Sequence, residues 1–337
     1  MNETRIVGSG LAGLLVAQHL LEIDHAGVIM HDHDDDLSAS NAPLAICHPF
    51  PGRSLKPSPH LEAAYMESSK WMARWASWAP ELVSELDMER PFESLGGERL
   101  RASYDKYWAD GANRWFSIQM NEDETGLRYG PCYAVRLGQL RKIWKERLQA
   151  DGVSFDKAPV PRGWKGPLVL CPGRGLKEWF PKLPLTREGG ELVTYSSEHH
   201  LTNLMSGGGV HIGPFGAGAV VGGSTRWTGE PPKLESQVDG LTQQLRALWP
   251  HTGTVSGVWR GMRAIHQTDR LPLAGPIPSR PKTWVVAALG SKGLLWGPLA
   301  ARVATDHLSQ GTPLPEAIST ARIAPGRWEL AWPDETA

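Results

Sequence analysis

The chain has 337 residues, enough for two domains or one large one, and it carries a formal net charge of −1. Such a balanced charge gives it no electrostatic attraction to nucleic acid or to an anionic membrane. Its three cysteines, Cys47, Cys132 and Cys171, form no CxxC pair, which disfavours a disulfide framework, a zinc site and a dithiol redox centre.

The apolar run at the N-terminus differs from a secretion signal and from a membrane anchor. Gly8, Gly10 and Gly13 interrupt it, and polar Gln18 follows soon after. It is also shorter than the ~20 apolar residues that a membrane span needs. We therefore expect a cytoplasmic protein without a membrane segment.

The first predicted elements are a buried strand over residues 4–7 and a helix over residues 11–23, joined by G-S-G-L-A-G. Gly8 permits a tight turn, Gly10 lets a pyrophosphate approach the backbone, and Gly13 lets helix and strand pack closely. The helix N-terminus supplies N–H groups and a partial positive charge. The pattern predicts a dinucleotide cradle; the alternative is a chance glycine-rich turn before a core helix.

The second predicted strand, residues 28–30, ends close to Asp32. An acidic residue about 20 positions after the glycines binds ribose hydroxyls in dinucleotide folds. The surrounding run H-D-H-D-D-D, residues 31–36, has the composition of a metal cluster, but crowded carboxylates after a strand are more typical of a solvated loop. We expect no metal site.

The sequence of the middle of the chain predicts further helices and strands. A helix is expected over residues 61–86, with Trp71, Trp75 and Trp78 on one face, and an amphipathic helix over residues 137–149. Residues 168–171 read as a buried strand leading to Gly173. Glycine-rich residues 189–226 predict hairpins, and residues 234–248 a helix that returns toward the nucleotide domain.

Near its C-terminus the chain predicts a second strand, turn and helix, over residues 284–289, 290–293 and 294–308. Pro298 is tolerated near the first helical turn. A helix N-terminus at this turn would stabilise the negative charge of a reduced flavin, which favours a flavin over a nicotinamide. An ordinary βα unit is the alternative.

Four segments carry a family resemblance: GSGLAG with Asp32; residues 39–53, A-S-N-A-P-L-A-I-C-H-P-F-P-G-R; residues 219–227, A-V-V-G-G-S-T-R-W; and G-M-R-A-I-H-Q-T-D-R-L-P-L-A-G followed by L-G-S-K-G-L-L-W-G-P. Together they resemble the flavoprotein oxidoreductase superfamily of D-amino-acid oxidase, glycine oxidase and sarcosine oxidase. They are more similar still to bacterial oxidoreductases allied to the oxidase domain of a bifunctional tRNA-modifying enzyme. Two departures are Ala45, where the family usually has glycine, and V-L-C-P-G-R-G, which keeps part of the family's strand end.

The resemblance implies an α/β fold: a Rossmann-like FAD-binding domain of the GR2 type with a mixed, mostly antiparallel β-sheet substrate domain. The FAD-binding domain is expected over residues 1–90, 133–180 and 258–337, and the substrate domain over residues 91–132 and 181–257. No cysteine lies near Arg263 or Gly290, so we expect FAD to be held non-covalently. The expected cofactor-binding residues are Gly8, Gly10, Leu11, Ala12, Gly13, Asp32, His33, Ser40, Ala45, Gly173, Gly290, Ser291, Lys292, Gly293 and Leu294.

The resemblance also implies a substrate site with three candidate catalytic residues. Arg263 matches the arginine that clamps the substrate carboxylate, and a guanidinium offers a planar bidentate fork for that purpose. The alternatives are a surface arginine or a structural pair with Asp269. His211 stands where glycine oxidase has a tyrosine, and Lys292 would either tune the flavin or face solvent.

The implied reaction is oxidation of the C–N bond of a small carboxylated amine or amino acid by hydride transfer to flavin N5, with O₂ or an electron carrier as acceptor. A second hypothesis is a flavin oxidase that acts on a carboxymethylaminomethyl group of a tRNA base. The near-zero net charge makes a nucleic-acid partner an unfavoured expectation. A third hypothesis is a non-catalytic flavin protein that serves a partner enzyme, which the presence of Arg263 disfavours.

Overall fold

The computed structural model describes the chain except for residues 1–2, 24, 26, 33–34, 51–54, 58–59, 95, 112–114, 217, 224–225 and 333–337. It forms two compact units. The first comprises Met1–Asn41, Arg141–Glu188 and Met262–Ala337, and the second comprises Ala42–Leu140 and Gly189–Gly261. The boundaries differ most from the expected ones at residues 42–90, which belong to the second unit.

The first unit is built on a six-stranded sheet in the order β14-β15-β8-β1-β2-β7. Five of its strands run parallel and β14 pairs antiparallel with β15. Parallel strands have both faces covered, which explains why these segments are short apolar runs. Their bounds are β1 Thr4–Val7, β2 Val28–His31, β7 Ser154–Asp156, β8 Leu168–Leu170, β14 Leu273–Ile277 and β15 Arg280–Ala287.

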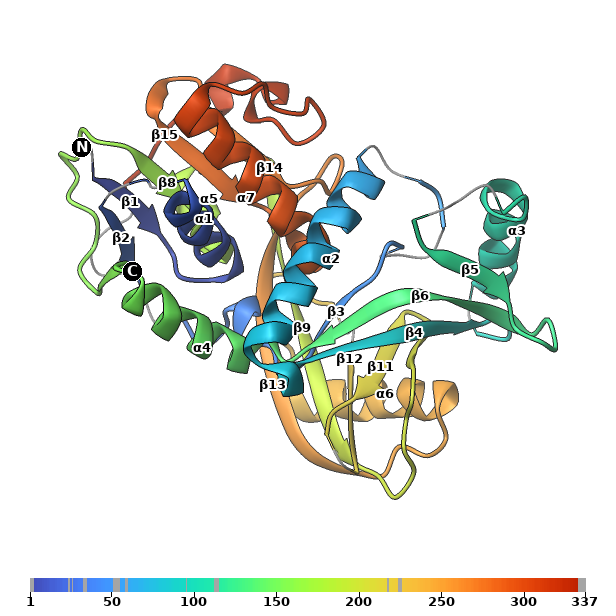
Figure 1. Cartoon of the computed structure of the whole chain (residues 1–337). Helices are drawn as coiled ribbons and strands as arrows, with labels where there is room; N and C mark the ends of the chain where they lie inside the picture. The colour runs from blue at the N-terminus through green and yellow to red at the C-terminus, as the bar shows by residue number, and fades with distance from the viewer. Residues whose placement is uncertain are drawn as a thin grey trace. The chain divides into compact units, whose positions relative to one another are not determined.

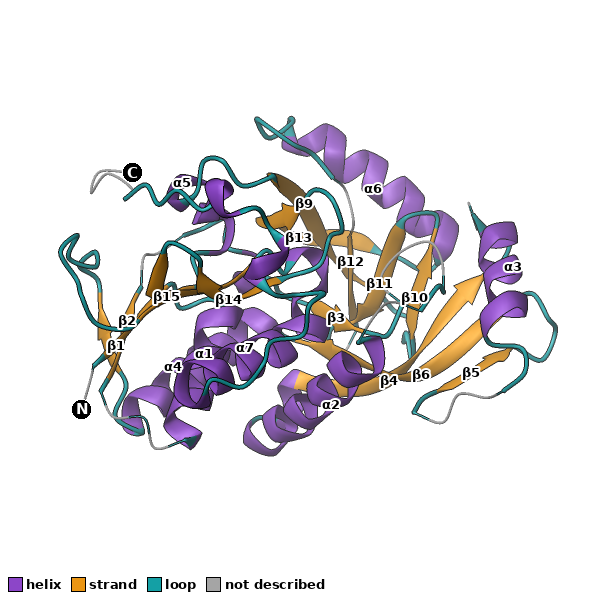
Figure 2. Cartoon of the chain, turned by 90° about the horizontal axis from the view of Figure 1, so that it is seen from above, coloured by secondary structure: helices purple, strands orange, loops and turns teal. Residues whose placement is uncertain are grey.

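Helices cover one face of this sheet. They are α1 (Leu11–Glu22), α7 (Gly293–Gln310) and α4 (Leu137–Ala150), of which residues 141–150 belong to this unit (Figure 2). The other face carries a core that includes the short helix α5 (Leu176–Trp179) and the buried Trp328 near the C-terminus. The sheet and these layers bring the glycine turns at both ends of the chain into one unit.

The second unit contains a sheet in the order β13-β9-β12-β11-β10-β4-β6-β3, with β5 paired to β6. Pairs β9–β12, β12–β11, β11–β10, β4–β6, β6–β3 and β6–β5 are antiparallel, whereas β10 and β4 are parallel. The ends of β9 and β13 continue into the first unit. The bounds are β3 Ala45–Cys47, β4 Val83–Pro91, β5 Ser117–Met120, β6 Gly126–Val135, β9 Leu185–Ser196, β10 Leu204–Gly207, β11 Val210–Pro214, β12 Ala219–Gly223 and β13 Thr254–His266.

The helices of the second unit are α2 (Leu61–Trp78), α3 (Gly97–Tyr107) and α6 (Leu234–Leu248). Helix α6 packs on β10, β11 and β12 (Figure 1). Its Leu241 and Leu245 share a core with Val210 and Ile212 of β11. The predicted bounds of α6 are confirmed, and the helix covers the sheet of its own unit.

The predicted helix over residues 61–86 is too long. Helix α2 ends at Trp78, a 3₁₀ turn begins at Pro80, and β4 starts at Val83. Proline lacks the N–H that would continue a helix, and the alternating residues after it suit a strand better. Among the described residues, no helix has the length and apolar character needed to cross a membrane.

Candidate functional site

In the first glycine turn, between β1 and α1, segments of backbone approach one another closely. Gly8 has φ +94°, and a Cβ built on it would lie 2.4 Å from the carbonyl oxygen of Cys171 at the end of β8. A Cβ on Gly13 would lie 1.9 Å from the Gly8 carbonyl oxygen. Only residues without a side chain fit at these two points, so β1, α1 and β8 meet closely where the sequence predicts the cradle.

Helix α1 begins directly after this turn, with Gly10 as its N-cap. The N-cap offers no side chain to the helix, so the first-turn N–H groups face other partners. Leu11 N–H donates to Ser40 Oγ at 2.9 Å, and Ala12 follows in the first turn. Ser40 lies in the 3₁₀ turn Ala39–Asn41 after β2, so two predicted cofactor segments meet at the helix N-terminus.

The carboxylate of Asp32 is held at the end of β2 by three donors. It accepts hydrogen bonds from Ser9 Oγ and Lys145 Nζ, and Arg141 Nη2 lies 3.3 Å from Oδ1. Burial alone would raise the pKa of Asp32, but the Lys145 and Ser9 hydrogen bonds and the charges of Lys145 and Arg141 outweigh burial and lower it. The carboxylate therefore stays ionised and fixed in orientation.

Arg141 connects the pieces of this cradle. Its guanidinium donates to the Ser9 carbonyl at 2.9 Å, to Ser9 Oγ at 2.7 Å and to Asn41 Oδ1 at 2.8 Å. Sequence reasoning missed Arg141 and Lys145, because both lie on α4, more than 100 residues after Asp32. The one available signal was the basic composition of that amphipathic helix.

A second bridge joins the loops that follow β2 and β8. Arg174 donates to both carboxylate oxygens of Asp35, at 2.7 and 2.9 Å. It follows Gly173, which has φ +55° and opens the 3₁₀ turn after β8. His33, also expected at the cofactor, lies outside the described residues.

The C-terminal glycine turn lies beside the N-terminal one. The 3₁₀ turn Gly290–Lys292 leads into α7, and a Cβ on Gly293 would lie 3.3 Å from Leu11 Cδ2. Ser291 and Leu294 flank this junction. Burial, followed by the nearby charge of Arg270, lowers the pKa of Lys292, which Asp269 partly opposes. The Lys292 side chain is half-buried in this turn.

Arg263 lies on the end of β13, between the loop after β2 and the C-terminal glycine turn. Its neighbour Met262 donates N–H to the Leu37 carbonyl at 2.7 Å, and Ile265 forms a β-bridge with Leu289. Arg263 Nη2 lies 3.6 Å from Glu188 Oε2, longer than a hydrogen bond. The first unit thus brings Arg263 close to both predicted flavin segments.

Asp269, the alternative structural partner considered for Arg263, bonds to two other side chains. The Asp269 carboxylate is bonded to His266 Nδ1 at 2.8 Å and to Arg322 Nε at 3.0 Å. An acidic neighbour of Arg263 is Glu188, which comes from β9 and also pairs with Arg270.

Two predicted site residues belong to the second unit. Ala45 opens β3 and pairs with Val135 of β6. His211 lies on β11, between Ser206 of β10 and Gly223 of β12. His211 is half-buried.

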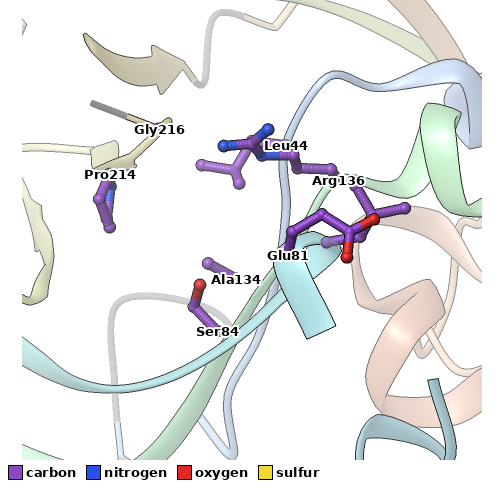
Figure 3. A pocket seen from close by; sticks show the side chains of 8 residues that line it. Leu44, Glu81, Ser84, Ala134, Arg136, Pro214 and Gly216 are labelled. Atoms are coloured by element: carbon purple, nitrogen blue, oxygen red, sulfur yellow. The ribbon is translucent and has the colours of Figure 1, made fainter. Parts of the chain in front are cut away.

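The second unit contains a cavity of about 250 Å³. Figure 3 shows Pro214 and Gly216 on one side of it and Arg136 and Glu81 on the other. The Arg136 guanidinium lies 4.9 Å from the Phe215 ring centre, so an intramolecular cation–π contact engages it. The volume is below the range of typical ligand pockets, and no predicted site residue lines the cavity.

The three cysteines are unsuited to covalent chemistry. Cys47, Cys132 and Cys171 are all buried and free. Burial raises the pKa of each thiol, to about 12 for Cys47, so the reactive thiolate is not populated near neutral pH. Among the described residues, no group of three His, Cys, Asp or Glu side chains could hold a metal ion.

Comparison with protein families and curated proteins identifies relatives. A family model described as DAO, FAD dependent oxidoreductase, matches residues 133–307. The tRNA 5-methylaminomethyl-2-thiouridine biosynthesis bifunctional protein MnmC of Maricaulis maris is 24% identical over 96% of this chain and 54% of the relative. The MnmC protein of Marinobacter nauticus is 28% identical over 55% of the chain and 30% of the relative. The chain thus spans about half or less of the length of these curated relatives.

Solved structures share the fold. Glycine oxidase from Geobacillus kaustophilus superposes with a TM-score of 0.77 at 17% identity, covering 96% of this chain and 99% of that one. Iminodiacetate oxidase from Chelativorans sp. BNC1 gives a TM-score of 0.75 at 15% identity, covering 94% and 99%. The predicted fold class is therefore confirmed.

Proposed function

Because the chain belongs to the family of FAD-dependent oxidoreductases, we propose that it oxidises the C–N bond of a small carboxylated amine or amino acid. The observation that carries this proposal is the position of Arg263, whose strand neighbours bond to the loop after β2 and to the glycine turn before α7. A guanidinium at this point offers a bidentate fork at fixed charge to a substrate carboxylate.

The residues of the first unit fit FAD. The glycine turn leaves no room for a Cβ at Gly8 or Gly13, and the N-terminus of α1 suits a pyrophosphate. Asp32 is ionised and would accept hydrogen bonds from ribose hydroxyls. When bound, FAD would supply the acceptor for a hydride from the carbon next to the substrate amine. The protein's task is then to orient the substrate and to hold its carboxylate, with O₂ or a carrier as the final acceptor.

The test of this proposal is anaerobic bleaching of the flavin absorbance by a panel of secondary amines and D- and L-amino acids. At least one carboxylated amine should reduce the flavin, and its decarboxylated analogue should react far more slowly. A protein that stays oxidised with the whole panel would support the non-catalytic hypothesis instead.

A second candidate function is oxidation of a carboxymethylaminomethyl group on a tRNA base. It is favoured by the match of nearly the whole chain to the tRNA-modifying relative from Maricaulis maris. The net charge of −1 disfavours it, because RNA binding usually needs a basic face. Adding tRNA that bears this group to the same panel separates the two functions.

We expect acid or heat to release all of the flavin. No described cysteine lies on the surface, and their raised pKa values suppress the thiolates that a covalent link would need. The measurement is the flavin absorbance of the supernatant and of the precipitated protein after denaturation. Flavin that stays with the precipitate would contradict non-covalent binding.

We expect Arg141→Ala to weaken FAD binding by about 10- to 100-fold. The Arg141 guanidinium holds Ser9 and Asn41 together by hydrogen bonds. Hydrogen bonds to a charged group contribute about 1.5–3 kcal/mol, which corresponds to a change of this size. The measurement is titration of the apoprotein with FAD, followed by fluorescence quenching. Lys142→Ala, an exposed change on the same helix, is the matched control. Equal affinities in both variants would show that Arg141 does not organise the cradle.

A further inference from the structure

Three parallel strands of the first unit end side by side at the first glycine turn. The sheet order places β1 between β8 and β2, and the register sets Val7 level with Leu170 on one side and with His31 on the other. Neighbouring strands lie about 4.8 Å apart, so the ends of β8 and β2 are separated by about 10 Å. A side-chain contact between the segments that follow these two strands therefore has to pass the end of β1.

Arg174 and Asp35 make such a contact. Each lies four residues beyond the end of its strand, Arg174 after β8 and Asp35 after β2. The guanidinium donates from Nε to Asp35 Oδ2 at 2.7 Å and from Nη2 to Asp35 Oδ1 at 2.9 Å. Both side chains are half-buried. A bidentate, charge-assisted pair of this kind is strong and fixes the orientation of both groups.

Hydrogen bonds connect this pair to the glycine turn. The Asp35 carbonyl accepts from Asn41 Nδ2 at 3.1 Å, and Asn41 Oδ1 accepts from Arg141 Nη1 at 2.8 Å. The same guanidinium donates to the Ser9 carbonyl at 2.9 Å, within the turn before α1. The pair is therefore held at the edge of the sheet where α1 begins, which is the edge that offers a helix N-terminus to an anion.

The main chain at each end of the pair has a further support. Asp35 Oδ1 also accepts the Leu37 N–H at 3.0 Å, and the Leu37 carbonyl accepts from the Met262 N–H at 2.7 Å. The Arg174 carbonyl accepts from Arg187 Nε at 2.9 Å. The ion pair can therefore open by rotation of the Arg174 side chain while both segments stay in place.

We propose that the Arg174–Asp35 ion pair is a strap across the FAD cradle, and that it opens each time FAD enters or leaves. In open α/β sheets a dinucleotide binds outside the carboxyl ends of the strands, which is the edge that this pair spans. Neither residue is among those predicted to contact the cofactor. The strap governs exchange of the cofactor and takes no part in the oxidation, so it is independent of the substrate.

The test measures both directions of cofactor exchange. Release is followed by the rise in flavin fluorescence when FAD-loaded protein is diluted, and association by the loss of fluorescence when apoprotein is mixed with FAD. Arg174→Gln should raise both rate constants about tenfold or more, because it removes a bidentate bond between charged groups. The dissociation constant should change by a smaller factor than either rate constant. A side chain that only contacts FAD would change chiefly the rate of release.

Asp35→Asn is the partner variant. It removes the opposite charge and keeps an acceptor for the Leu37 N–H, so it should accelerate exchange in a folded protein. The double variant should exchange FAD no faster than either single variant, since both changes break one contact. Lys182→Met, which removes an exposed ion pair with Glu329 in the same unit, is the control and should leave both rate constants within about twofold of the parent. Thermal midpoints verify that each variant is folded.

Salt provides a measurement on the parent protein. Raising the ionic strength from about 0.1 to about 1 M shortens the Debye length from about 10 to about 3 Å, which favours the open pair. Both rate constants of the parent should rise more than those of Arg174→Gln. A change in only one rate constant of Arg174→Gln, or in neither, would overturn the strap. A parent whose exchange responds to salt no more than that of the variant would overturn it as well.

Discussion

Gly10→Val should purify without FAD. Gly10 precedes the first turn of α1, and a Cβ at this position would lie 3.0 Å from Ser40 Oγ and 3.7 Å from Ser40 Cβ. The Cβ alone is a tight fit, and the two methyl groups of valine would extend over the helix N-terminus, where a pyrophosphate needs the backbone. We expect the affinity of the apoprotein for FAD to fall at least about 100-fold, or about 2.7 kcal/mol.

The choice of Gly10 separates cofactor binding from folding. A side chain on Gly13 would collide with the Gly8 backbone, so its loss would disturb the packing of strand and helix themselves. The control is Gly163→Val, which lies in open space in the same unit and should retain FAD. The measurements are the flavin-to-protein absorbance ratio, an FAD titration and the thermal midpoint. If Gly10→Val keeps its fold and binds FAD stoichiometrically, the turn is not the pyrophosphate cradle.

The glycine turn could be predicted from sequence because its requirements are local. Strand, turn and helix are consecutive, and Gly13 answers a steric demand of the Gly8 carbonyl within the same turn. The same holds for the turn at Gly290, where a strand, a 3₁₀ turn and a helix again follow one another.

The partners of the site residues could not be predicted, because they come from distant segments. Asp32 was expected to bind the ribose hydroxyls, and the structure adds Lys145 and Arg141 of α4, which bond to it. Arg263 was expected at the substrate carboxylate, with Asp269 as an alternative structural partner, and Glu188 of the distant strand β9 lies beside it. Charge pairing across sheets depends on tertiary packing, which no periodic pattern in the sequence records.

Arg263→Ala should keep its FAD and lose catalytic efficiency. If the guanidinium holds the substrate carboxylate, the loss of a charge-assisted bidentate contact costs about 2–4 kcal/mol, or about 30- to 1,000-fold in kcat/KM. Lysine at this position should restore only part of the loss, because a point charge cannot reproduce the fork. Small carboxylates should inhibit the parent competitively and the variant much less.

A purely structural role for Arg263 predicts a different pattern, because the residue also lies beside Glu188. Arg270 pairs with the same carboxylate from a more exposed position, with Nη2 3.3 Å from Glu188 Oε1. Arg270→Ala therefore loosens Glu188 without removing the proposed fork, and it should leave carboxylate inhibition intact. If Arg270→Ala and Arg263→Ala lose efficiency and inhibition equally, Arg263 acts by holding Glu188. Only a loss confined to Arg263 assigns the carboxylate to its guanidinium.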